Sequence, residues 1–167
     1  INSSPDKTSI LFCYSLGKAQ RLLNLISKTN FSKNIYTHKS IYKMNTCYKN
    51  LGIDLIDTRI FEKTNNIENL KGNLLLLPPG LNKASYLKNI KDTQTSFASG
   101  WMSIRAFRKR CGCDKGFAIS DHADWDAIIK TVKESEASNV FFHHGDNDAL
   151  NKYFQEKKLV NILNLQK

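Results

Sequence analysis

Histidines are the residues of this sequence best suited to acid–base or metal chemistry. The chain has four of them: His38, His122, His143 and His144. Asp124 follows His122 by two residues, and a carboxylate at that distance can orient an imidazole and hold it protonated. Gly145 follows His144 and would let backbone and a metal ion approach closely. A zinc site normally takes three or more protein ligands, so the residues indicate a partial site. The alternative is that each histidine is structural or simply exposed.

His122 lies between a predicted strand and a predicted helix. The strand is the apolar run 116–120, and the helix is the pattern through residues 125–132. Asp124 is the expected N-cap of that helix. His122 therefore falls at the carboxyl end of a strand, which is where α/β sheets usually place their sites.

His143 and His144 end the next predicted strand, residues 139–143, ahead of a helix marked by residues 149–154. The ends of neighbouring strands converge on a common edge of a sheet, so His122 is expected to meet one of these two histidines. Successive strand residues point to opposite faces, so only one of His143 and His144 should face the site.

The rest of the chain continues this alternation of strands and helices. Further strands are predicted at 9–15, 35–37, 73–78, 95–102 and 159–163, and further helices at 19–26, 41–48 and 85–90. Several strands are continuously apolar, as in sheets that helices cover. The sequence thus predicts an α/β or layered αββα protein, in which residues 53–72 form a loop-rich connection.

The charge of the chain favours a polyanionic partner. Its 167 residues carry a formal net charge of +10, which points to nucleic acid first and to an anionic membrane surface second. The alternative is a solvated lysine-rich surface. The longest apolar stretch, 74–79, is too short to span a bilayer. No secretory signal opens the chain, so we expect a cytoplasmic protein with free thiols.

Two groups of residues could contact phosphates. The first lies at a predicted helix start, where exposed N–H groups and the helix dipole suit an anion: Ser15, Gly17, Lys18 and Arg21. The alternative for this group is an ordinary capped helix. The second is a basic run that leads into the turn at Gly112: Arg105, Arg108, Lys109 and Arg110. It would track a nucleic-acid backbone without reading its sequence, or else form a solvated turn.

Several segments resemble the β-CASP nucleases of the metallo-β-lactamase fold. They are 93–102 (TQTSFASGWM), 116–125 (GFAISDHADW), 140–145 (VFFHHG) and, within the inserted CASP lobe, 14–23 (YSLGKAQRLL). The resemblance is strongest to the bacterial DNA-ligase-associated exonuclease group and weaker to the endonucleases that process messenger-RNA 3′ ends. It covers nearly the whole chain, although residues 53–72 add nothing to it.

The resemblance implies a role for each matching residue. His122 would protonate the leaving oxygen, Asp124 would position His122, and His144 would bind one of two divalent metal ions. Those ions would be zinc, with manganese as the alternative, and would activate a water and stabilise the cleaved phosphodiester. Ser99 and Gly100 would line the active-site cleft.

The sequence departs from the resembled family in one respect. The defining His-x-His-x-Asp-His motif is absent, and residue 1 is Ile rather than Met. We therefore expect a C-terminal portion of the protein, in which 1–92 are part of the β-CASP lobe. Residues 93–167 would be the returning segment of a partial metallo-β-lactamase (αββα) fold. This chain alone is expected to be inactive.

The resulting hypothesis is a metal-dependent nuclease that hydrolyses nucleic-acid phosphodiester bonds. The resemblance favours DNA over RNA and an exonuclease of repair or end processing, working with a DNA ligase system. One alternative is an RNA-processing endonuclease of the same family. Another is a nucleic-acid-binding module without catalysis, and a third is a small-molecule hydrolase of the same superfold.

Overall fold

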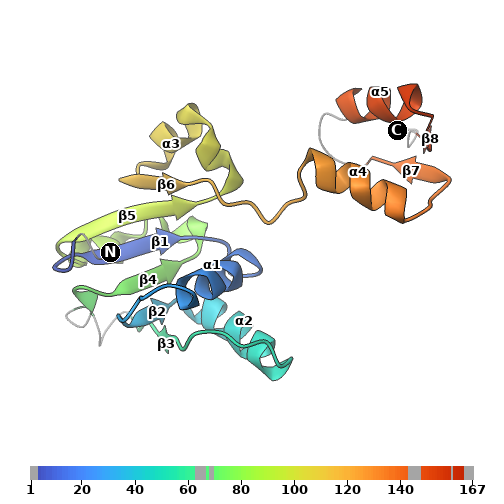
Figure 1. Ribbon diagram of the computed structural model, residues 1–167. Coiled ribbons are helices and arrows are strands. Elements are labelled where there is room, and N and C mark those ends of the chain that lie inside the picture. The colour runs from blue at the N-terminus through green and yellow to red at the C-terminus, as the bar shows by residue number, and fades with distance from the viewer. Residues whose placement is uncertain (1–3, 63–66, 68–69, 143–147, 159, 164–167) are drawn as a thin grey trace. The chain divides into compact units, whose positions relative to one another are not determined.

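Figure 1 shows the computed structural model, which describes residues 4–62, 67, 70–142, 148–158 and 160–163. The chain forms two units, Ile1–Asp121 and His122–Lys167. The boundary predicted between residues 92 and 93 separates a β-CASP lobe from a metallo-β-lactamase segment, and it stays a prediction. The sheet of the first unit contains strands from both sides of this boundary.

The first unit is built on a six-stranded sheet. Its strands are β1 (Thr8–Phe12), β2 (Ile35–Thr37), β3 (Arg59–Ile60), β4 (Leu74–Leu77), β5 (Thr93–Ala98) and β6 (Lys115–Phe117). They lie in the order β3-β2-β4-β1-β5-β6, and every neighbouring pair is parallel. Crossover connections between parallel strands need helices or long loops, so this arrangement confirms the predicted α/β class.

The central strands β1 and β4 are buried along their whole length because both faces of the sheet are covered. Leu11 and Leu76 belong to the core on one face, and Phe12, Leu75 and Leu77 to the core on the other. All four residues of β4 are buried. Continuous burial of this kind is what the apolar runs predicted.

Helices α1 (Lys18–Ser27) and α2 (Lys39–Asn50) cover the first of these faces. Leu22, Leu23 and Ile41 are the residues through which they join its core. On the opposite face lie the 3₁₀ helices η2 (Pro79–Leu81) and η3 (Ser85–Asn89), and Leu81 and Leu87 pack against its core.

Two strand predictions in the first unit were wrong in detail. The predicted strand 95–102 ends at Ala98, and the chain turns into the 3₁₀ helix η4 (Gly100–Ser103). The basic run, for which no element was predicted, forms the helix α3 (Arg105–Cys111), and Gly112 ends it in the left-handed conformation. The predicted strand 116–120 is β6, which stops at Phe117 because its partner β5 stops at Ala98.

The loop-rich interpretation of residues 53–72 was also incomplete. Arg59 and Ile60 form β3, an exposed edge strand that pairs with Tyr36 and Thr37. Two residues are too few to give a recognisable apolar pattern, so the sequence carried no signal for this strand.

The second unit contains α4 (Trp125–Glu134), β7 (Asn139–Phe141), α5 (Asp148–Glu156) and β8 (Asn161–Leu163). β7 and β8 pair in parallel, as the predicted strand–helix–strand unit requires. Phe154 is fully buried and stacks on Phe142, and Tyr153 meets Trp125 edge-on at 5.6 Å between ring centroids. No helix in the described part of the chain is long and apolar enough to cross a membrane.

Candidate functional site at the carboxyl edge of the sheet

The parallel sheet places the ends of its strands, and the loops that follow them, along one edge. The chain leaves β1 toward the β2 side of the sheet and later adds β5 and β6 on the other side of β1. α/β proteins usually bind their ligands outside the strand ends, at a change of direction of this kind. Ser15 and Gly17 follow β1 at this point, and Ser99 and Gly100 follow the neighbouring β5. The fold therefore brings these four predicted site residues to one edge.

The start of α1 is closed by its own backbone. Gly17, its N-cap, has φ +76° and ψ −67°, which only glycine adopts at low cost. The amide groups of Lys18 and Ala19 donate to the carbonyls of Leu16 and Tyr14, at 2.9 and 3.1 Å. These two N–H groups, expected to face a phosphate, therefore already have partners within the loop.

Lys18 is a buried cation with a partner from another part of the chain. Its side chain is 3% exposed, and its Nζ lies 2.8 Å from Asp121 Oδ1. The ammonium group also lies 5.2 Å from the centre of the Tyr14 ring. Burying a lysine is costly unless it is paired, so this contact fixes the segment after β6 against the start of α1.

Arg21 and Gly100 both lie close to Ser120. Arg21 donates a hydrogen bond to the carbonyl of Ser120. A Cβ at Gly100 would come within 3.2 Å of Ser120 Cβ, so a side chain there would require Ser120 to move by a few tenths of an ångström. Lys18 and Arg21, predicted to bind phosphate, thus both contact residues 120–121, although Arg21 stays exposed.

A chain of hydroxyl and imidazole groups, not predicted from the sequence, links β1 to α2. Ser15 Oγ lies 2.8 Å from Ser40 Oγ, which lies 2.8 Å from His38 Nδ1. His38 is the N-cap of α2 and accepts the Ser40 amide N–H through Nδ1. His38 follows strand β2 directly, so its position at a predicted strand end was the signal that could have identified it.

Cys13 lies at the end of β1 and is fully buried. Burial raises the pKa of its thiol to about 12, although the charge of Lys18 opposes the shift. A thiol in this setting stays protonated, and it does not act as a nucleophile at neutral pH. We therefore assign Cys13 to the core and not to the site.

The raised pKa of Cys13 has a consequence for stability. Above pH 9.0 the unfolded chain loses the thiol proton while the folded chain keeps it. The contribution of Cys13 to the free energy of unfolding is therefore complete below pH 9 and is lost toward pH 12. The slope is about 1.4 kcal/mol per pH unit. We expect urea midpoints between pH 8 and 10.5 to fall more steeply for the wild type than for Cys13→Ala. Parallel slopes would contradict this assignment.

The residues with predicted catalytic roles lie in the second unit. Asp124 is the N-cap of α4, as predicted, and its Oδ1 accepts the Ala127 amide N–H at 2.9 Å. His122 is exposed, just ahead of this cap. His143 and His144 lie outside the described residues. Within the residues that are described, no three His, Cys, Asp or Glu side chains gather as a metal site. The described residues alone do not hold a metal pair, and the predicted ligand His144 is not among them.

Substitutions at Asp124 separate its capping role from its charge. Asp124→Asn keeps a good capping oxygen, so we expect α4 to remain as stable as in the wild type. Asp124→Ala leaves the Ala127 N–H without its partner and should cost about 1 kcal/mol. Urea unfolding of both variants, followed by circular dichroism, checks this order, and equal losses would show that the side chain does not cap the helix.

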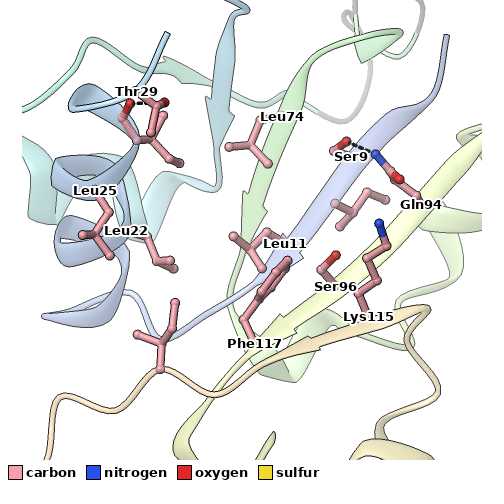
Figure 2. A pocket seen from close by; sticks show the side chains of 13 residues that line it. Ser9, Leu11, Leu22, Leu25, Thr29, Leu74, Gln94, Ser96, Lys115 and Phe117 are labelled. Atoms are coloured by element: carbon pink, nitrogen blue, oxygen red, sulfur yellow. Dashed lines mark hydrogen bonds between the residues drawn. The ribbon is translucent and has the colours of Figure 1, made fainter. Parts of the chain in front are cut away.

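An apolar groove of about 330 Å³ lies beside α1, on the face of the six-stranded sheet that α1 covers (Figure 2). Leu22 and Leu25 of α1, Leu11 of β1 and Phe117 of β6 line it, and Ser96 and Lys115 are among its polar neighbours. Its walls offer apolar contact rather than hydrogen bonds, so it does not suit a phosphate. We therefore leave this groove out of the candidate site.

Comparison with known proteins shows a similarity over most of this chain. The chain is 27% identical over 140 residues to a probable DNA ligase of Opitutus terrae (strain DSM 11246 / JCM 15787 / PB90-1). The match covers 84% of this chain but only 13% of that protein, so the chain spans a small part of its relative. No protein-family model matches the chain.

Proposed function

We propose that this chain is part of a metal-dependent nuclease that hydrolyses DNA phosphodiester bonds, acting as an exonuclease in repair or end processing. The observation that carries the proposal is the gathering of Ser15, Gly17, Ser99 and Gly100 at the carboxyl edge of a parallel sheet. These residues belong to two segments that resemble β-CASP nucleases, and they come from parts of the chain far apart in sequence.

The similarity to a probable DNA ligase supports DNA as the substrate. The matched region is 13% of that protein, so a separate segment joined to a ligase would account for the match. A nuclease that prepares DNA ends for joining would suit such an arrangement. We accordingly propose that the protein works with a DNA ligase system.

The proposed chemistry assigns one role to each of two residues of the second unit. His122 protonates the leaving oxygen of the cleaved phosphodiester, and an exposed position leaves it accessible to a substrate. Asp124 orients His122. One Asp124 oxygen accepts the Ala127 N–H, and a carboxylate has further acceptor positions for an imidazole.

The metal ions remain part of the proposal. His144 would be one ligand, and residues outside 1–167 would supply the others. Zinc is the first candidate and manganese the second, because imidazole and carboxylate ligands accommodate both. The ions would activate the attacking water when bound.

The test is cleavage of end-labelled single-stranded DNA and RNA by two samples, this chain and the product of the whole coding sequence that contains it. Each is assayed with zinc and with manganese. We expect metal-dependent cleavage of DNA by the whole product and none by residues 1–167. Preferential cleavage of RNA would instead favour an RNA-processing endonuclease of the same family.

The basic surface supports a second candidate, a nucleic-acid-binding module without catalysis. Binding by the same samples is therefore measured alongside cleavage. A folded, metal-loaded whole product that binds DNA and cleaves neither substrate would overturn the nuclease proposal and leave this module.

A further inference from the structure

We propose that η4 and α3 form a docking surface for an unpaired nucleic-acid strand, with Trp101 stacking on a base and the cations of α3 contacting the phosphates. This surface, the aromatic–basic patch, consists of Trp101, Arg105, Phe107, Arg108, Lys109 and Arg110. The inference deepens the proposed function because it names the form of the substrate. It is tested by binding alone, so it can fail independently of cleavage.

The aromatic part of the patch is a stacked pair with an open side. The rings of Trp101 and Phe107 are 4.7 Å apart at their centroids and inclined by 26°. Trp101 is nevertheless 58% exposed, so the indole remains accessible beyond its contact with Phe107. Every base has a π-face, so an exposed ring of this kind can stack on a base of any sequence.

The charged part of the patch is unusual for so short a helix. Four of the seven residues of α3 are cations, and the helix has no acidic residue. Within the described parts of the chain, no ion pair involves any of these four side chains. Like charges this close repel one another, and a polyanion would relieve that repulsion.

The position of Arg108 is set by close packing. Its Cγ and Cδ would lie 3.2 and 3.3 Å from a Cβ at Gly116, so the stem of the side chain rests on β6 where a side chain is missing. Arg110 lies beside the stacked pair, with its Cζ 5.5 Å from the Phe107 ring centre. The aliphatic stem of an arginine can pack against the protein while its planar guanidinium group binds phosphate oxygens.

A nucleic acid fits the patch better than an anionic membrane does. Helices that lie in a membrane interface present a broad apolar face opposite their basic one. α3 instead is only seven residues long and has no buried residue, so it presents no broad apolar face. An unpaired strand fits better than a duplex, because the bases of a duplex are already stacked on one another.

The experiment measures binding of the full 167-residue chain to three labelled 20-mers by fluorescence anisotropy: a single strand, its duplex and an abasic strand. Trp101→Ala should weaken binding of the single strand about 5- to 100-fold. It should leave binding of the abasic strand unchanged. Trp101→Phe, which keeps an aromatic face on Phe107, should recover most of the affinity.

The matched charge variants are Arg105→Ala/Lys109→Ala in the patch and Lys88→Ala/Lys91→Ala outside it, which remove the same charge from exposed positions. The plot of log K against log salt has a negative slope. The first pair should make this slope less steep by about 1.4, and the second pair should change it much less. Equal effects of the two pairs would overturn the proposal. So would unchanged affinity in Trp101→Ala, or binding to anionic vesicles in place of the single strand.

Discussion

Replacing His122 by alanine is expected to lower the rate of DNA cleavage by the whole coding product about 100- to 10,000-fold, the usual loss when a general acid is removed. The reason is that an alkoxide leaves a phosphodiester slowly unless it receives a proton. His122 is exposed and has Asp124 two residues away to orient it. Initial rates on end-labelled single-stranded DNA measure the loss.

A sulfur substrate separates this role from a structural one. When the leaving oxygen is replaced by sulfur, the leaving group departs without a proton, so wild type and His122→Ala should cleave at similar rates. Lys157→Ala, an exposed position of the same unit, is the control and should match the wild type on both substrates. An equal defect of His122→Ala on both substrates would contradict an acid role.

Asp121→Asn is the substitution we expect to destabilise the first unit most among the site residues. It leaves the Lys18 ammonium, 3% exposed, without its carboxylate partner. Breaking a buried pair costs about 3–5 kcal/mol, and the one-third exposure of Asp121 reduces our expectation to about 2–4 kcal/mol. Urea unfolding of the chain measures the change.

A double substitution tests whether the cost comes from the pair. Lys18→Met/Asp121→Asn removes both charges, so much of the lost stability should return, because a buried pair replaced by apolar groups is often neutral. A coupling energy of about 0.5–3 kcal/mol is expected from the four variants. Strictly additive losses would show that Lys18 and Asp121 do not stabilise the fold together.

The sequence predicted the strands and helices that are defined by long apolar patterns. β1 and β4 are buried on both faces, and their continuous apolar runs were recognisable for that reason. α1 and α4 each present one apolar face at helical spacing. The N-cap Asp124 was predicted because capping depends only on neighbouring residues.

The parts that were missed depend on contacts between distant residues. α3 shows no apolar periodicity, and Phe107 stacks on Trp101 while Gly116 accommodates the Arg108 stem. The insertion of β4 between β1 and β2 likewise follows from strand pairing, which local patterns do not encode.

The candidate site was predicted only in part for the same reason. Ser15 and Gly17 were identified from a predicted helix start and Ser99 and Gly100 from a resemblance, and the parallel sheet brings them to one edge. The ion pair between Lys18 and Asp121 and the hydrogen bonds from Ser15 through Ser40 to His38 join segments far apart in sequence. No local pattern could show that Lys18 would be buried.

The measurement that tests the nuclease proposal most directly compares two forms of one DNA sequence, a linear single strand and a covalently closed circle. The whole coding product is incubated with each in the presence of zinc or manganese. We expect the linear strand to be degraded from an end while the circle stays intact. Survival of both forms with a folded, metal-loaded protein that binds DNA would contradict the nuclease, and cleavage of the circle would contradict the exonuclease.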